Sequence, residues 1–337
     1  MKVLNIFLLI VIYSVSFAFP SFANQPEFFI KSAETDNEIK APRRSDYGDD
    51  LFVRDEGQEY LIQTDELEYW YRKKIIHTAD IHIRRQLYHE NYERQFQKFI
   101  SEVKTQVSEY EYDEVRVVIA GDLVHEKINI SNEQLMVTSK FLNDIAEQIS
   151  PVVIIPGNHD FLENNHERTD SITPIIELLN NENIRFYKDS GVYKDDNINW
   201  VVYSLYQHNQ RPEFEKGDGL YVGLFHSPIM GLSTDTGYEF EDSFSPQSFT
   251  GLDLLLCGDI HKRQVFELPE GGQAIMVGSL IQQNFGETVQ HHGYGIYDVP
   301  TDKYTFYDID NEEPFLHFSI SDIKDIEDEK EILLNLK

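Results

Sequence analysis

Five short segments of this chain carry the aspartate, asparagine and histidine side chains that bind divalent metal ions in proteins. In chain order they are Asp80-Ile81-His82, Gly121-Asp122-Leu123-Val124-His125, Gly157-Asn158-His159-Asp160, Phe225-His226-Ser227 and Gly258-Asp259-Ile260-His261. A carboxylate that bridges two cations, flanked by ligands for each, can hold them about 3.5 to 4 Å apart. Such a pair clamps the attacking and leaving oxygens of an in-line displacement at phosphorus. The segments therefore indicate a two-metal hydrolytic site.

The segments that carry ligands are expected at the ends of β-strands. Four of them follow short apolar runs rich in β-branched residues, namely 75–76, 115–120, 152–155 and 254–257. Runs of this kind between loops are typical of strands buried on both faces of a sheet. Because open α/β sheets place their sites beyond the carboxyl ends of the strands, the ligands are expected to meet there.

The order of the expected elements indicates the fold class. Strands alternate with helices in the first half of the chain, where one helix is expected over 90–107 and another after Ser131. Ser131 and Gln134 have the spacing of a capping box. The second half is mostly strands, and its loop 230–250 is long enough to be functional. This order predicts an α/β fold with two facing mixed β-sheets flanked by helices, an αββα sandwich.

Length and composition limit the domain organisation. With 337 residues, of which 41% are hydrophobic, the chain can bury a sizeable core. We expect a signal-like apolar segment over 1–23, an acidic and poorly ordered extension over 24–72, the catalytic domain over 73–310 and a truncated acidic C-terminal segment over 311–337. The single cysteine, Cys257, excludes an intrachain disulfide framework.

The chain is strongly acidic, with a formal net charge of −30. The excess is not confined to the ligands, since residues 24–72 carry 13 acidic side chains against 6 basic ones, and residues 308–337 carry 10 against 3. The composition therefore lacks the excess of basic residues that is typical of a nucleic-acid-binding surface. Small soluble substrates, which need no basic groove, fit this charge better.

The first 23 residues have the pattern of a secretory signal. Lys2 precedes a mostly apolar run over 3–19, and Ser21 and Ala23 provide small residues where an export peptidase reads the chain. At about 17 residues the run is at the short limit for a membrane span, so a membrane anchor is the alternative. A third interpretation is that this stretch and the polar residues that follow it were not part of the ancestral gene.

Taken together, the five segments resemble the pattern of the calcineurin-like metallophosphoesterases over residues 74–300. Within that superfamily the details resemble the SbcD family in its phage-type form, the nuclease subunit of the SbcC/SbcD double-strand-break repair complex. The resemblance is carried by residues 76–82, 121–125, 156–160 and 278–287. The last segment, from Gly278 to Glu287, lies outside the ligand set, so a generic phosphatase would not be expected to contain it.

The resemblance implies two metal sites and two further catalytic histidines. One metal would be bound by Asp80, His82, Asp122 and His261, and the other by the bridging Asp122 with Asn158 and His226. His159 would approach the scissile phosphate, to stabilise charge or protonate the leaving oxygen. His125 would help to orient the substrate or the attacking water. The usual metal of the family is Mn²⁺, so two divalent ions, Mn²⁺ by this resemblance, are expected.

The chain departs from the superfamily pattern at Asp259, where a histidine is expected. A carboxylate can also bind Mn²⁺ or Mg²⁺, and on this interpretation Asp259 is a ligand of the second metal. The alternative is a centre with one tightly bound and one labile metal. In either case Asp259 adds negative charge close to the substrate phosphate.

Three hypotheses for the function remain open. The first is an SbcD-like DNA exonuclease and endonuclease of recombination and repair, which implies an SbcC-like ATPase partner and a possible homodimer. The second is an exported phosphomonoesterase or nucleotidase on the same fold, which would make use of the signal-like start. The third is a degenerate metal-binding or regulatory subunit. The nuclease hypothesis favours the cytoplasm, with export as the alternative, while the short C-terminus puts partner binding in question.

Overall fold

The computed structural model describes residues 72–316 apart from 86–87, 166, 208–210, 218, 242 and 270. It also describes four short strands nearer the N-terminus. They form two antiparallel pairs, β1 (Phe29–Lys31) with β2 (Glu38–Lys40), and β3 (Leu51–Asp55) with β4 (Gln58–Ile62). The sequence alone predicted no strand in this extension. The signal-like segment and residues 317–337 lie outside the described residues.

The first of two six-stranded sheets contains the predicted N-terminal strands. In spatial order its strands are β16 (Lys303–Asp308), β15 (Gly293–Asp298), β5 (Lys74–Thr78), β6 (Val115–Ala120), β7 (Val152–Ile155) and β8 (Ile184–Phe186). The four strands from β5 to β8 run parallel, and β15 and β16 extend the sheet antiparallel. The carboxyl ends of β5, β6 and β7 therefore lie at one edge of the sheet.

The second sheet is built from the strand-rich half of the chain. In spatial order its strands are β13 (Gln264–Glu267), β14 (Gln273–Met276), β12 (Leu254–Gly258), β11 (Leu220–His226), β10 (Ile198–Tyr203) and β9 (Gly191–Asp195). The four central strands are parallel, and β9 and β13 are antiparallel edges. Both sheets are mixed, which confirms the predicted fold class.

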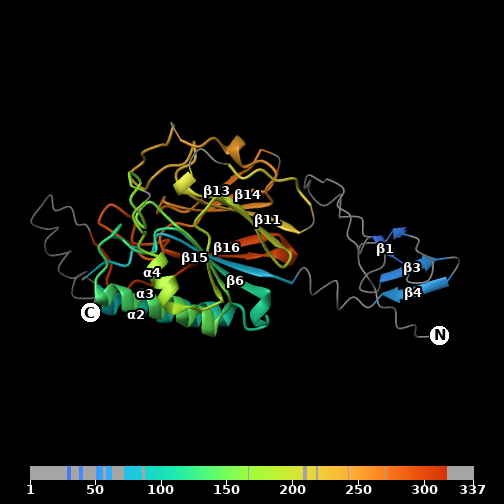
Figure 1. The fold of residues 1–337 in the computed structure, drawn as a ribbon, viewed down its shortest axis with the longest axis horizontal. Coiled ribbons are helices and arrows are strands. Elements are labelled where there is room, and N and C mark those ends of the chain that lie inside the picture. Colours follow the sequence, from blue (N-terminus) through green and yellow to red (C-terminus); the bar gives the residue numbers. More distant parts are fainter. Residues whose placement is uncertain are drawn as a thin grey trace, which may run out of the picture.

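The helices α2 (His89–Gln106) and α3 (Asn132–Gln148) lie on one side of the sheets (Figure 1), and two apolar layers hold the sheets in place. Buried residues of both sheets, such as Val118 and Leu224, meet in the inner layer. On its other face the first sheet packs against α2, α3 and α4 (Thr173–Leu179). Phe96 of α2 stacks on Phe141 of α3, with ring centroids 3.8 Å apart. The helix predicted over 90–107 is thus confirmed within one residue at each end.

The outer face of the second sheet is covered by the loop that follows β11 rather than by one of these three helices. Ile229, Leu232 and Phe249 of this loop are buried against strand residues such as Leu255. The length of this loop predicted a functional role for it. Its few apolar residues give it a packing role, since they close the third apolar cluster.

The predicted capping box at the start of α3 forms only in part. The Ser131 hydroxyl accepts the backbone N–H of Gln134 at 3.1 Å, as expected. The Gln134 side chain, however, donates to the carbonyl oxygen of Ile83 at 2.6 Å instead of returning to the cap. That bond ties the helix to the segment that follows β5.

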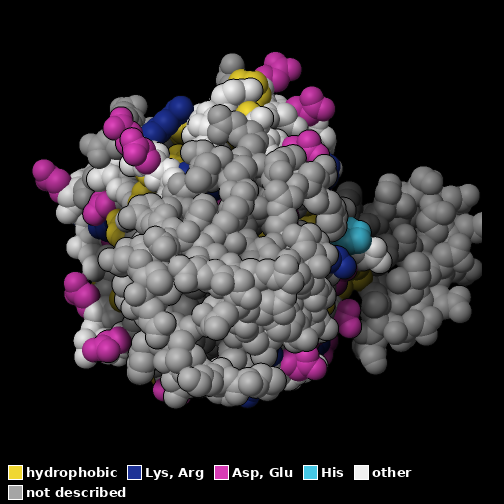
Figure 2. Space-filling view, turned by 90° about the vertical axis from the view of Figure 1, so that its right-hand side faces the viewer, with side chains coloured by type: hydrophobic (Ala, Val, Ile, Leu, Met, Phe, Trp, Pro, Cys, Tyr) yellow, Lys and Arg dark blue, Asp and Glu magenta, His cyan; other side chains and the backbone are white. Residues whose placement is uncertain are grey.

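No helix among the described residues is long and apolar enough to cross a membrane. On the face shown in Figure 2, acidic side chains are scattered around the visible rim of the described body, and basic ones lie among them.

Candidate metal centre

The predicted ligands gather where strands of both sheets end. Asp80 follows β5, Asp122 follows β6, and Asn158 follows β7 after a short turn. From the second sheet, His226 is the last residue of β11 and Asp259 follows β12. Strand β6 contacts both β11 and β12, so the two sheets bring these ends together.

Four residues of the centre have backbone in the left-handed region. The φ angles are 51° at Asp80, 49° at His82, 53° at Asp122 and 90° at Asp259. Such angles are uncommon for residues other than glycine and persist only where the surroundings enforce them. Here the backbone N–H of His82 donates to the carbonyl oxygen of Asp122 at 2.9 Å, which links the two turns. The strain is concentrated where the ligands must face inward.

One group of metal-binding atoms surrounds the fully buried imidazole of His226. Its Nε2 lies 3.4 Å from Asp122 Oδ1 and 3.9 Å from Asp80 Oδ1. Its Nδ1–H donates to the carbonyl oxygen of Ala120 at 2.6 Å, so Nε2 is the nitrogen available to a metal. A Cβ on Gly121 would lie 2.2 Å from the His226 ring, so only glycine fits there.

A second group joins His82, His261 and the two carboxylates. The Nε2 atoms of His82 and His261 are 3.2 Å apart, and His82 Nε2 is 3.4 Å from Asp122 Oδ2. His261 Nε2 lies 3.8 Å from Asp80 Oδ1. Neighbouring ligands of one octahedral cation are spaced by about 3 Å, and these separations are close to that value. Asp122 therefore offers one oxygen to each group, as a bridging ligand would.

The donor set fits divalent metals because two buried acceptors of the described centre lack hydrogen-bond partners. They are Asn158 Oδ1 and His226 Nε2. An unsatisfied buried polar atom costs free energy, which a bound cation would recover. Carboxylate and amide oxygens combined with imidazole nitrogens suit Mn²⁺ and related ions.

Asp259 lies at the edge of this arrangement. Its Oδ1 is 3.8 Å from His226 Nε2, and its side chain keeps 19% of its surface exposed. Its backbone N–H donates to both Asp80 oxygens, at 3.0 and 3.1 Å. It belongs to neither of the two tight groups, which contain Asp80 with His82 and His261, and Asp80 with Asp122 and His226. Its role as a metal ligand remains a prediction.

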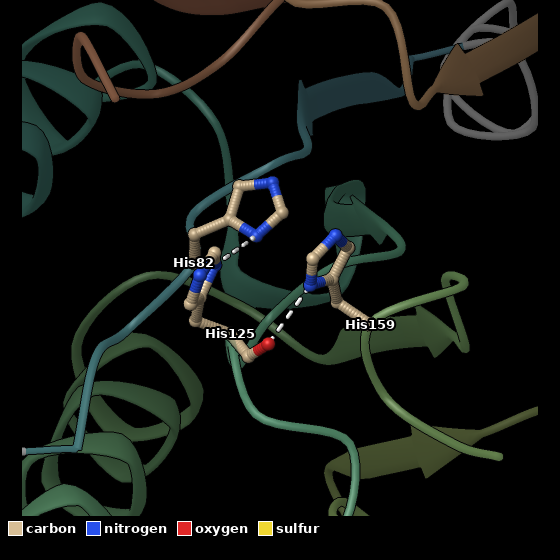
Figure 3. A group of neighbouring side chains, drawn as sticks. All are labelled: His82, His125 and His159. Atoms are coloured by element: carbon tan, nitrogen blue, oxygen red, sulfur yellow. Dashed lines mark hydrogen bonds between the residues drawn. The ribbon is translucent and has the colours of Figure 1, made fainter. Parts of the chain in front are cut away.

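His125 and His159 are half-buried and lie next to His82 (Figure 3). Their rings stack with centroids 4.9 Å apart, and His159 Nδ1–H donates to the carbonyl oxygen of His125 at 2.8 Å. His125 Nδ1 is 3.3 Å from His82 Nδ1. The three histidines are close enough to bind an ion. His82 would then have to use Nδ1, whereas its Nε2 faces Asp122. Figure 3 shows all three side by side, with the hydrogen bond of His159 at Nδ1.

Two further carboxylates support the centre. Asp160 accepts the backbone N–H groups of Asp122 (2.9 Å), Gly157 (2.7 Å) and Val124 (3.1 Å). Sequence reasoning missed Glu287, whose Oε1 accepts from His261 Nδ1–H at 2.7 Å. Its position in the segment 278–287 was the available signal, because that segment resembled the nuclease family without containing a ligand.

The charged groups of the centre shift one another's pKa values. Burial raises the pKa of Asp80 to about 7, with nearby Asp122 adding to the shift and His226 opposing it. Burial lowers the pKa of His226, but Asp122 and Asp80 outweigh it, and the pKa lies well above its ordinary value. Burial likewise lowers the pKa of His261, whereas Glu287 and Asp80 raise it to about 9. Cations binding here would displace protons from these groups.

Residues 73–263 match the family described as calcineurin-like phosphoesterase, which is more than half of the chain. The chain therefore belongs to this family of metal-dependent phosphoesterases. An uncharacterised protein of Acanthamoeba polyphaga mimivirus is 32% identical over 236 residues, which are 66% of this chain and 17% of that protein. The chain thus spans less than a fifth of that relative's length.

Among solved structures, that of the Pseudomonas putida nuclease MPE is similar over 76% of this chain and 98% of its own chain. The sequence identity is 11% and the TM-score is 0.29. A similarity of this size supports no conclusion about fold or activity.

Proposed function

We propose that this phosphoesterase is an SbcD-like DNA nuclease of recombination and repair that uses two divalent metal ions, both of them Mn²⁺. One observation carries the proposal beyond phosphoester hydrolysis. The segment 278–287, which resembles the nuclease family outside the ligand set, is part of the centre, because Glu287 fixes the His261 ring. Gln283 of the same segment donates to the carbonyl oxygen of Ile81, next to His82.

The residues of the centre divide into metal ligands and groups that act on the substrate. On this proposal Asp80, His82, Asp122 and His261 bind one ion, and Asp122, Asn158, His226 and Asp259 bind the other. The two ions, when bound, would polarise the phosphate and activate water. His159 uses Nδ1–H to hold the His125 carbonyl, so a protonated ring presents its Nε2–H to the leaving oxygen. His125 positions His159 by stacking and through that carbonyl.

A phosphomonoesterase or nucleotidase is the second candidate, and the charge of the protein favours it. A net charge of −30 repels a polyanion at long range but affects a small substrate less. The same centre could hydrolyse either ester, since the ligands act on the phosphoryl group common to both.

The purified full chain, loaded with Mn²⁺, should be assayed on linear duplex DNA, single-stranded DNA, a chromogenic phosphodiester and a chromogenic phosphomonoester. The nuclease proposal expects cleavage of DNA and of the diester. Activity on the monoester alone would overturn it in favour of the second candidate. No hydrolysis at full metal occupancy would indicate a regulatory subunit instead.

Partner and location follow from the nuclease proposal and need their own tests. We propose an SbcC-like ATPase as partner, with homodimerisation possible, and the cytoplasm as the site of action. Pull-down with an SbcC-like ATPase and sedimentation of the purified chain test the assembly. Sequencing the N-terminus of the mature protein tests the location, because a start at Asn24 would mean export.

A further inference from the structure

Three aromatic rings form a continuous strip beside the metal centre. Phe285 is 63% exposed and Tyr88 is 45% exposed, while Phe315 between them is half-buried. The ring of Phe315 meets Phe285 at a centroid distance of 5.1 Å and Tyr88 at 5.9 Å, both edge to face. Large aromatic side chains left this exposed commonly mark a binding surface.

Hydrogen bonds fix the backbone that carries the strip. The buried Gln282 side chain donates to the carbonyl oxygen of Phe315 at 3.0 Å and accepts its backbone N–H at 2.8 Å. Tyr88 has φ = 66°, an unfavourable angle for a bulky residue. Strain of this kind is stored mainly where a side chain must point in one direction.

The strip is continuous with the centre at both ends. Phe285 is two residues before Glu287, the partner of His261, so it lies within about 7 Å of Glu287 along the backbone. Tyr88 accepts the backbone N–H of Tyr92 at 2.8 Å, and the Tyr92 hydroxyl donates to the His82 carbonyl at 2.7 Å. Glu287 and Tyr92 therefore connect the strip to the two ligands His261 and His82.

A positive charge lies close to both the strip and the centre. Arg84 is two residues after His82, and its guanidinium donates to the carbonyl oxygen of Gln283, two residues before Phe285, at 3.4 Å. Burial, followed by the charge of Arg84, lowers the pKa of His125. A cation next to exposed aromatic rings matches a backbone phosphate followed by a base.

We propose that Phe285, Tyr88 and Phe315 form a stacking platform for an unpaired base next to the scissile phosphate, with Arg84 contacting the adjoining phosphate. The proposal rests on the proposed nuclease function and narrows its substrate to strands with unpaired bases, such as single strands or frayed ends. A base inside a duplex could not stack on the platform, because both of its faces are occupied by its neighbours.

The test measures kcat/KM of the full chain with Mn²⁺ on labelled oligonucleotides whose product lengths identify the scissile bond. Phe285→Ala should lower kcat/KM on single-stranded DNA about 5- to 150-fold, the effect of losing one stacked base. Phe285→Tyr should restore it. Activity on a chromogenic phosphodiester, which has no base, should be unchanged in both variants.

Tyr238→Ala is the matched control, because Tyr238 is 64% exposed and its ring packs on Phe240 rather than on the strip. It should change kcat/KM on DNA less than twofold. A series of oligonucleotides with one abasic site gives a second measurement. The wild-type chain should lose activity when the abasic site is next to the cut, and Phe285→Ala should be insensitive to it.

Equal DNA cleavage by wild type and Phe285→Ala would overturn the platform and leave the strip to a protein partner. A parallel loss on the chromogenic diester would also overturn it, because the residue would then act on the centre itself. Absence of DNA cleavage by the wild type, with the diester or monoester still hydrolysed, would instead reject the nuclease function.

Discussion

At the scale of single residues, the centre depends on which atom each side chain presents. His226 and His261 each use Nδ1 in a hydrogen bond, to Ala120 and Glu287, and so turn Nε2 inward. Asp122 directs one oxygen to each group of ligands. His159 instead anchors Nδ1 on a carbonyl outside the ligand cluster. This difference separates the ligands from the group assigned to acid catalysis.

This difference between the metal ligands and His159 predicts the effect of His159→Gln. The His159 backbone N–H donates to Asp122 Oδ1 at 2.8 Å, whereas its side chain is hydrogen-bonded to the carbonyl oxygen of His125. A change of side chain should therefore keep both metals and lower kcat by about 10²- to 10⁴-fold. Metal content by mass spectrometry and kcat on a chromogenic phosphodiester check this. Loss of bound metal in the variant would show that His159 is a ligand.

Glu287→Gln tests a carboxylate that acts through a ligand. The Glu287 carboxylate orients His261 and makes its ring more basic, so the variant should weaken Mn²⁺ binding about 10- to 100-fold. At saturating Mn²⁺ most of the activity should return. Glu267→Gln, on the edge strand β13, is the control and should leave the Mn²⁺ affinity as it is.

Asp259→Asn tests the residue at which the chain departs from the family. If Asp259 is a ligand, the variant should bind one Mn²⁺ tightly and the second at least about tenfold more weakly. Titration of the metal-free chain, followed calorimetrically, measures both sites. Unchanged occupancy of both sites would remove Asp259 from the ligand set.

At the scale of elements, a buried ion cluster fixes the second sheet on the first. Asp195 at the end of β9 accepts two bonds from Arg116 of β6, at 2.7 and 3.0 Å. It also pairs with Arg185 of β8 at 2.5 Å and accepts the Trp200 indole N–H at 3.2 Å. Burial raises the pKa of Asp195, but Arg116 and Arg185 outweigh it and hold the pKa below its ordinary value.

Asp195→Asn should lower the free energy of unfolding by about 3 kcal/mol, because the buried Arg116 loses its counter-charge. Lys140→Met, which breaks the exposed pair with Asp144, is the control and should cost less than about 1 kcal/mol. Urea unfolding at neutral pH measures both. A loss in Asp195→Asn no larger than in the control would contradict the ion cluster's role.

The same cluster has a defined dependence on pH. A carboxyl with a depressed folded pKa stabilises the protein fully above its unfolded pKa of about 3.9, and this contribution is lost as the pH falls towards the folded pKa. The difference in stability between wild type and Asp195→Asn should therefore be constant above about pH 5 and shrink below about pH 4.

At the scale of the whole molecule, several buried carboxylates lie close together at the metal centre, and the basic side chains around them are too few to balance their charge. Asp80, Asp122 and Asp160 are all nearly inaccessible to solvent around one centre, in a protein of net charge −30. Divalent cations would relieve their repulsion, so metal binding and stability should be coupled.

Removal of metals with a chelator should therefore lower the Tm of the full chain, and Mn²⁺ should restore it. At a free Mn²⁺ concentration of 100 Kd the gain is about 2.7 kcal/mol per site, or several degrees. Differential scanning calorimetry at matched ionic strength measures the change. Asp122→Asn, which lacks the bridging charge, should respond much less, and an equal response would place the stabilising metal elsewhere.

The sequence by itself determined the strands that precede the ligands, the fold class and the order of the ligand segments. Buried parallel strands are continuous apolar runs, and a ligand directly after such a run must lie at a sheet edge, so the pattern is local. The tertiary structure alone decided which imidazole nitrogen faces inward, that Glu287 supports His261, and that the loop after β11 packs as a core element. Those facts depend on contacts between residues distant in the chain, such as Asp80 with Asp259 or Tyr88 with Phe315, and no local pattern encodes such contacts.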